Sequence, residues 1–176
     1  ERAIKKASDK NTENYKEVLF EGYAPYGIAV LVETATDNNN RTVANVRSYF
    51  NKANGNLGTA GSVEFMFDRT CNFRINPEGL DVEEIELEYI DHGVEEVFSD
   101  DDGILLYAPF EQFGTVQKAL ESEGIEILSS GFERIPQVLK QLNPDQEQEV
   151  LNLVEKIEED DDVQQVYHNL EIQTED

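Results

Sequence analysis

The sequence predicts an α+β protein in which a discontinuous domain is interrupted by a ferredoxin-like domain. Three observations predict it. Residues 70–135 show strand and helix patterns in the order βαββαβ, the plan of the split βαβ fold. Residues 13–69 show the order strand, strand, helix, strand, and a helix and strand pattern follows the βαββαβ segment. One helix and one strand cannot bury their apolar faces alone, so we expect this last pair to complete the first sheet.

A hairpin begins the first domain. Residues 18–22 alternate unevenly between apolar and polar positions, as in a strand, and residues 28–32 are a β-branched apolar run typical of a central strand. Between them, Pro25 presets the backbone of a turn and Gly27 permits a positive φ. Two antiparallel strands joined by this turn are therefore expected.

A capped helix follows the hairpin. Asp37 and the three Asn after it offer side-chain oxygens to the free N–H groups of a helix start. Val43, Val46 and Phe50 then fall at i, i+3 and i+7 on one face, and Gly55 marks the helix end. The alternation over residues 63–67 predicts a further strand after this helix.

The remaining elements follow from the same periodicities. In the inserted domain we expect strands at 71–75, 94–98, 104–107 and 125–135, with helices around 82–89 and 110–120. A last helix opens at Pro144 and is broken by the acidic run 160–162, before a strand from Val163. The expected domains are residues 1–12 as the remnant of a helical domain, 13–69 with 141–176 as the discontinuous domain, and 70–140 as the acidic insert.

The charge of the chain is unevenly distributed. Its formal net charge is −24, yet residues 1–75 hold ten Lys/Arg and nine Asp/Glu, whereas residues 76–176 hold four and twenty-nine. The second part would repel nucleic acid. The alternative interpretation of this acid excess is a solvated surface that favours solubility.

Other bulk features narrow the class of protein. A single cysteine, Cys71, excludes an internal disulfide framework. No apolar run approaches the ~20 residues of a membrane helix, and no signal peptide is visible. The chain opens inside what looks like a helix, without Met, so we expect it to be a fragment. A cytoplasmic protein without a membrane partner is predicted.

No arrangement of residues predicts catalysis, a metal site or a cofactor. The two histidines, His92 and His168, are far apart and lack transition-metal spacing with the one cysteine. The acidic runs at 100–102 and 160–162 lack the alternating ligands of a calcium loop. The glycines at 55, 58 and 61 follow a helix instead of a strand and lack the Lys of a phosphate loop. We therefore expect that the protein is not an enzyme and carries no cofactor.

One basic, amide-rich segment predicts nucleic-acid binding instead. Arg and Asn side chains suit phosphate and base-edge contacts, a helix start adds backbone donors, and a tyrosine can stack on bases. The alternative is that the amides cap and turn the chain while the basic side chains are merely solvated. The candidate contact residues are Tyr23, Asn38, Asn40, Arg41, Arg47, Lys52, Asn56 and Arg69.

Several motifs resemble those of the YebC/PmpR family, and the resemblance runs from about Glu1 to Ile172. They are Glu21-Gly22-Tyr23, Thr36-Asp37-Asn38, Asn40-Arg41-Thr42-Val43, Val46-Arg47, Asn56-Leu57-Gly58, Gly61-Ser62-Val63, Phe67-Asp68-Arg69 and the closing segment 161–169. The resemblance implies three domains: a helical bundle, an α+β middle domain and a ferredoxin-like domain inserted into the middle one. It also implies that only the last helix of the bundle, residues 1–8, remains here.

The chain departs from the family pattern at three places. The family turn Gly-Tyr-Gly-Pro-Gly-Gly is Gly-Tyr-Ala-Pro-Tyr-Gly at residues 22–27. The family motif Asn-Arg/Lys-Asn-Arg is Asn-Asn-Asn-Arg at residues 38–41, with one positive charge fewer. The Lys-Gly that follows Asp-Arg in the family is Thr70-Cys71 here. These changes remove expected phosphate contacts at residues 39 and 70 but leave the fold prediction intact.

Three hypotheses about function follow from the resemblance and the charge pattern. The family includes transcriptional regulators, which implies a regulator that binds DNA. It also includes a mitochondrial translational activator, which implies an RNA- or ribosome-associated translation factor. The third hypothesis is a protein-interaction module that binds a partner through the acidic domain.

Overall fold

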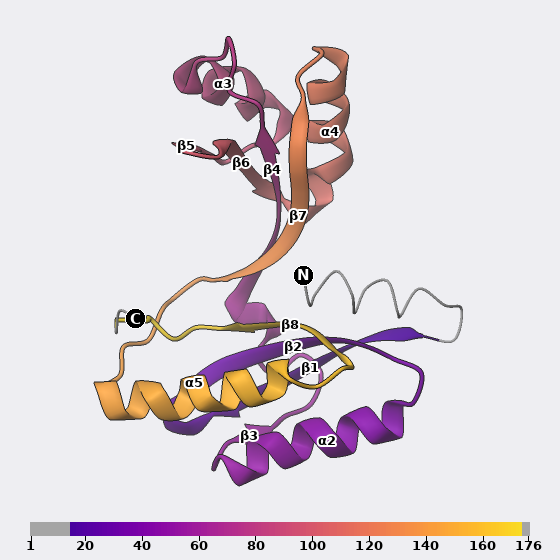
Figure 1. Cartoon of the computed structure of the whole chain (residues 1–176), viewed down its shortest axis with the longest axis vertical. Helices are drawn as coiled ribbons and strands as arrows, with labels where there is room; N and C mark the ends of the chain where they lie inside the picture. Colours follow the sequence, from indigo (N-terminus) through magenta and orange to yellow (C-terminus); the bar gives the residue numbers. More distant parts are fainter. Residues whose placement is uncertain (1–14, 174–176) are drawn as a thin grey trace. The chain divides into compact units, whose positions relative to one another are not determined.

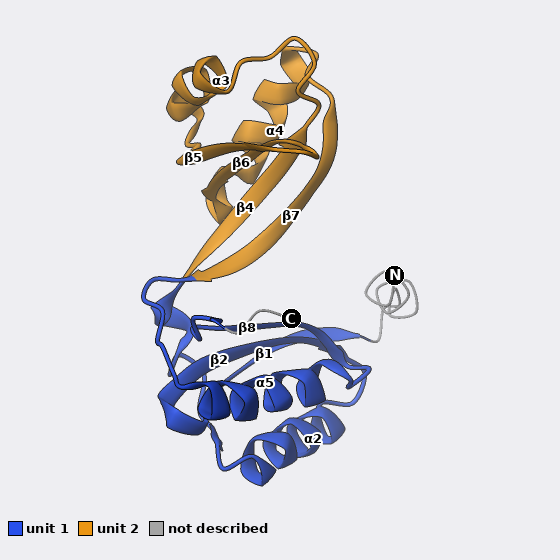
Figure 2. Ribbon diagram, turned by 60° about the vertical axis from the view of Figure 1, so that its left-hand side comes forward, with its two compact units in different colours: residues 1–67, 136–176 blue, residues 68–135 orange. Residues whose placement is uncertain are grey.

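The computed structural model describes residues 15–173, which form two compact units with a four-stranded sheet each (Figure 2). The first unit contains residues 15–67 and 136–173, and the second contains residues 68–135. The helix expected at residues 1–8 lies outside the described residues. The α+β fold class predicted from the sequence is confirmed.

The sheet of the first unit has the strand order β3-β1-β2-β8. Strands β1 and β2 pair antiparallel over their whole lengths, and the C-terminal strand β8 adds to the free edge of β2. The late strand therefore completes the first sheet, although the whole second unit separates it from β2 in the sequence. The strands are β1 (Lys16–Ala24), β2 (Ile28–Thr36), β3 (Asn56–Leu57) and β8 (Val163–His168).

Two helices, α2 (Asn39–Lys52) and α5 (Pro144–Glu158), cover one face of this sheet (Figure 1). Alternate residues of the strands point to that face and pack against the apolar side of each helix. Burial of this shared apolar surface, more than helix propensity, stabilises the two helices. The core includes Phe20, Val30, Val32, Val46, Phe50, Val150, Leu153, Val154, Ile157, Val163 and Val166.

The prediction of a strand at residues 63–67 is wrong. Residues Glu64–Met66 form a 3-10 turn, and a strand begins only at Phe67 and continues into the second unit. The backbone N–H groups of Val63 and Glu64 donate to the carboxylate of Glu21 and are thus unavailable for a strand ladder. The two-residue strand β3 pairs with β1 in place of the expected strand.

The second unit has the strand order β5-β6-β4-β7, which is the ferredoxin-like order with the first and last strands side by side. Helices α3 and α4 pack with the sheet around a separate core that includes Phe73, Ile75, Tyr89 and Leu106. Strand β4 is one continuous strand where two were expected. The elements are β4 (Phe67–Ile75), α3 (Val82–Tyr89), β5 (Glu96–Asp100), β6 (Gly103–Pro109), α4 (Phe113–Ser122) and β7 (Ile127–Pro136).

His168, at the end of β8, makes the folding stability of the first unit depend on pH. Its Nδ1 accepts a hydrogen bond from the N–H of Leu170 at 3.2 Å, and burial lowers the pKa of His168 from its usual value of 6.5. The unfolded chain therefore binds this proton more readily, so the stability contributed by neutral His168 is lost as the pH falls below about 6.5.

We expect wild type to lose more unfolding free energy than His168→Gln between about pH 7.5 and about pH 5.5, because Gln does not titrate. Urea denaturation at both pH values measures the difference. An equal loss in the two proteins would show that His168 does not contribute to the pH dependence.

Candidate nucleic-acid interface

The segment 38–62 is free of acidic residues. It holds three Lys/Arg and no Asp/Glu, in a chain with 38 Asp/Glu in total. The segment spans α2, β3 and most of the glycine-rich loop that leads toward β4. Because nucleic acid is a polyanion, a segment without acidic side chains of its own opposes its approach less than the rest of the chain does.

The outward face of α2 carries amide and guanidinium groups. Asn40, Ala44, Arg47 and Asn51 follow the spacing i, i+4, i+7 and i+11 and are all exposed. We call these four residues, with Lys52 beside them, the α2 face. The helix buries Thr42, Val46 and Phe50 on its other side. Folding of the unit therefore leaves the α2 face available for a partner.

Arg47 and Lys52 are the available cations of the α2 face. Both side chains are exposed, and within residues 15–173 neither makes a hydrogen bond or an ion pair. Lys52 lies in the last turn of α2, where a cation is favoured by the helix dipole. Among the described residues, a phosphate group would need to displace no partner to contact these two side chains.

Asn38 has a structural role at the start of α2. Its side-chain oxygen accepts a hydrogen bond from the N–H of Arg41 at 3.2 Å, so Asn38 is the N-cap of the helix. Asn40, two residues later, is exposed on the α2 face. Of the two asparagines predicted as contact residues here, Asn40 is the one with a free side chain among the described residues.

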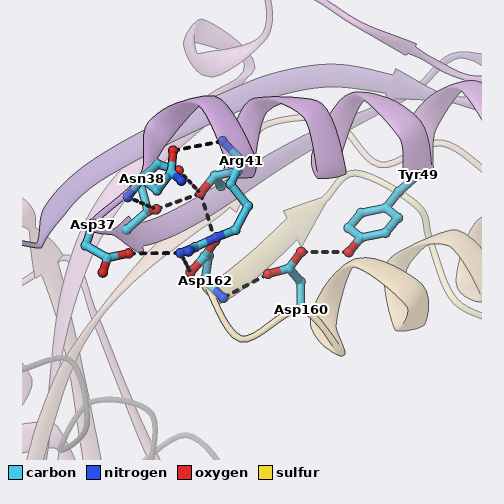
Figure 3. A network of polar contacts seen from close by, with 8 residues as sticks. Asp37, Asn38, Arg41, Tyr49, Asp160 and Asp162 are labelled. Carbon is cyan, nitrogen blue, oxygen red and sulfur yellow. Dashed lines mark hydrogen bonds and ion pairs between the residues drawn. The ribbon is translucent and has the colours of Figure 1, made fainter.

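Arg41 is held in an ion pair with the turn between α5 and β8 (Figure 3). Its Nε and Nη2 donate to the two carboxylate oxygens of Asp162 at 3.2 and 2.9 Å, and Nη2 also lies 3.0 Å from Asp37. Asp162 is 4% exposed, so this bidentate pair is buried on the carboxylate side. Arg41 thus neutralises a buried carboxylate.

Hydroxyl groups complete this polar network. We call it the α2 clasp, and its members are Thr36, Asp37, Arg41, Thr42, Tyr49, Asp160 and Asp162. Thr42 Oγ1 lies 2.8 Å from Asp162 and 2.7 Å from Thr36 Oγ1. Tyr49 donates to Asp160 at 2.6 Å, and Asp160 also accepts the N–H of Asp162 at 2.9 Å (Figure 3). Burial, followed by the Asp160 hydrogen bond, raises the pKa of Tyr49, so its hydroxyl stays a donor. The clasp fixes the start of α2 to the 160–162 turn.

The clasp borders a surface hollow of about 550 Å³ with an acidic lining. Four aspartates, at positions 37, 160, 161 and 162, face a single arginine there. An anion entering this hollow would meet more negative than positive charge. We therefore place the nucleic-acid contacts of the first unit on the α2 face and not beside Arg41.

Glu21 organises the glycine-rich loop. It is 3% exposed, and its carboxylate accepts the N–H groups of Gly61, Val63 and Glu64 at 2.6, 2.9 and 2.7 Å. Its backbone oxygen accepts the N–H of Gly58 at 2.7 Å. A buried carboxylate that receives several charge-assisted hydrogen bonds is strongly anchored, so the loop has a defined shape beside β1.

Sequence reasoning did not identify Glu21 as an organising residue. The available signal was a carboxylate at an inward position of a strand, followed in the sequence by a glycine-rich segment that could supply N–H donors. Gly61 has a φ of +88°, which favours glycine, and a Cβ on Gly58 would lie 2.7 Å from Ser62 Oγ. The path that Glu21 stabilises therefore favours glycine at position 61, whereas a side chain at position 58 would require Ser62 to move.

Three further predicted contact residues lie on elements other than α2. Tyr23 is half-buried with Ala29 and Leu31 on the sheet face opposite α2, and its hydroxyl donates to Met66 Sδ at 3.9 Å. Asn56 is exposed in β3, opposite Tyr23 in the ladder. Arg69 belongs to the second unit, where its guanidinium lies 3.6 Å from the ring centroid of Phe110.

Residues 15–170 match a family model described as the second and third domain of TACO1/YebC. The chain belongs to the TACO1/YebC family. The match covers both compact units, which confirms the resemblance seen in the motifs.

Its curated relatives in the TACO1/YebC family are named probable transcriptional regulatory proteins. One from Flavobacterium psychrophilum is 71% identical over 97% of this chain and 72% of the relative. One from Myxococcus xanthus is 52% identical over 96% of this chain and 72% of the relative. The crystal structure of a conserved hypothetical protein from Aquifex aeolicus is similar, with a TM-score of 0.74, 36% identity, and coverage of 94% of this chain and 68% of that one.

No group of three or more His, Cys, Asp and Glu side chains within residues 15–173 is arranged to hold a metal ion. In the same part of the chain, no helix combines the length and the apolar character that crossing a membrane requires.

Proposed function

We propose that this protein is a cytoplasmic transcriptional regulator that binds DNA through the α2 face. The observation that carries the proposal is a solvent-facing helix side whose basic and amide groups have no partner within residues 15–173, in an acid-free segment of a strongly acidic chain. The names of the relatives support the regulatory role.

The chemistry of the α2 face suits a duplex. The major groove admits an α-helix, Arg side chains bind guanine and phosphate, and Asn side chains bind adenine. Arg47 and Asn51 lie four residues apart on the exposed side of α2, and Asn40 lies two turns earlier. The same groups also suit RNA, so RNA of matched sequence is the second ligand in the test.

We expect Arg47→Glu with Lys52→Glu to weaken binding to a fluorescein-labelled duplex of about 30 base pairs by tenfold or more. Two lost phosphate contacts would reduce the slope of log K against log salt by about 1.8. Fluorescence anisotropy at several salt concentrations measures both quantities. The matched control is Lys118→Glu with Lys156→Glu, which makes the same charge change at exposed lysines outside α2.

The wild-type chain itself is expected to bind DNA weakly at moderate salt, because its net charge is −24. An affinity and slope unchanged in the Arg47/Lys52 variant, or reduced equally in the control, would overturn the assignment of the α2 face. Tighter binding to the matched RNA would favour the translation-factor alternative. Arg41→Glu is a poor test of DNA binding, because this substitution also breaks the α2 clasp.

A further inference from the structure

Helix α3 of the second unit and the 3-10 turn that follows it (Ile90–His92) present two aliphatic side chains to solvent. Leu87 is 74% exposed and Ile90 is 62% exposed. They are three residues apart, and Ile90 keeps helical backbone angles (φ −59°, ψ −34°) as the C-cap of α3, so the two side chains are neighbours on one side. The helix contributes Ile85 and Tyr89 to the core instead. Folding of the unit therefore does not account for the positions of Leu87 and Ile90.

Acidic side chains surround this apolar pair. Positions three and four residues from Leu87 hold Glu83, Glu84 and Asp91, and the position four residues before Ile90 holds Glu86. All four acidic residues are exposed. We call this set of six residues the α3 face.

The sequence around the α3 face is strongly acidic, and His92 is its one titratable base. Residues 75–117 contain thirteen Asp/Glu and no Lys/Arg. No Lys or Arg within this stretch neutralises the carboxylates around Leu87 and Ile90. The charge of a partner is therefore strongly restricted, because like charges around an apolar contact oppose binding.

We propose that the α3 face is a docking site for a basic amphipathic helix of a partner protein. Apolar residues of such a helix would cover Leu87 and Ile90, and its flanking Lys or Arg would pair with the surrounding carboxylates. Nucleic acid and a second α3 face both carry charge of the wrong sign for this surface. The inference does not depend on the proposed binding of DNA by the α2 face.

The test uses the full chain and a labelled 18-residue peptide of Leu and Lys arranged to form an amphipathic helix. A second peptide of identical composition distributes its Leu residues around the helix. We expect the amphipathic peptide to bind wild type at least tenfold more tightly than the second peptide, in fluorescence anisotropy at about 0.1 M salt. Higher salt should weaken both interactions.

Substitutions in the α3 face test whether this surface binds the amphipathic peptide. Leu87→Ser with Ile90→Ser should weaken binding of the amphipathic peptide about tenfold or more. The matched control is Val138→Ser with Leu139→Ser, which removes exposed aliphatic groups from the first unit (73% and 51% exposed) and should leave the affinity unchanged. All four positions are exposed, so the variants should fold, and thermal unfolding checks this.

Two results would overturn the proposal: equal affinity of wild type for both peptides, or unchanged affinity in the Leu87/Ile90 variant. An equal loss in the Val138/Leu139 control would overturn it as well. The Arg47→Glu/Lys52→Glu variant should bind the peptide normally, so a failure here is distinct from a failure of the DNA proposal.

Discussion

Glu21→Gln is expected to lower the free energy of unfolding by about 3 kcal/mol. Both oxygens of the Glu21 carboxylate accept backbone N–H groups of the glycine-rich loop. A glutamine keeps one oxygen but turns an NH₂ group toward at least one of these donors. Hydrogen bonds to charged groups contribute about 1.5–3 kcal/mol each, and a buried donor left without an acceptor adds about 1–3 kcal/mol.

Urea denaturation measures the stability loss, and hydrogen exchange of the Gly61, Val63 and Glu64 amides measures the loosening of the loop. The matched control is Glu17→Gln, an exposed carboxylate on the same strand, which should change stability little. Unaltered exchange at the three loop amides in Glu21→Gln would contradict the assigned role.

Asp162→Ala is expected to cost about 2–4 kcal/mol of unfolding free energy. The change removes the buried acceptor for Thr42 and separates the 160–162 turn from the start of α2. The exposed guanidinium of Arg41 can be solvated after the change, which keeps the loss below that of a fully buried ion pair.

Equilibrium unfolding in urea checks the effect, with an unchanged m-value as evidence that the folded state is retained. Asp161→Ala is the matched control, because Asp161 is the exposed neighbour in the same turn. Similar midpoints for wild type and Asp162→Ala would show that the α2 clasp does not stabilise the first unit.

Local patterns account for what the sequence predicted correctly. The apolar spacing of Val46 and Phe50 placed the buried side of α2 correctly. The turn glycines and the alternation of short strands likewise revealed the βαββαβ order, because these signals lie within a few residues of each other.

Long-range polar contacts account for what the sequence could not predict. The pattern at residues 63–67 fits a strand, and the residue that prevents it is Glu21, more than 40 positions earlier. In the sequence Arg41 has the appearance of an unpaired cation, because its partner Asp162 lies 121 positions later. Neither partner can be deduced from periodicity, since many carboxylates in this chain were equally available.

The adjacent position of β4 and β7 has a consequence for the order of folding. To the first unit, residues 68–135 are a loop whose ends must meet before β8 can pair with β2. Once the second unit has formed, its first and last strands already hold these ends together. Shortening a flexible loop from tens of residues to a few lowers the entropic cost of closure by roughly 2–3 kcal/mol. Early formation of the second unit should therefore accelerate folding of the first, and pulsed hydrogen exchange that protects β8 before β4 and β7 would contradict this order.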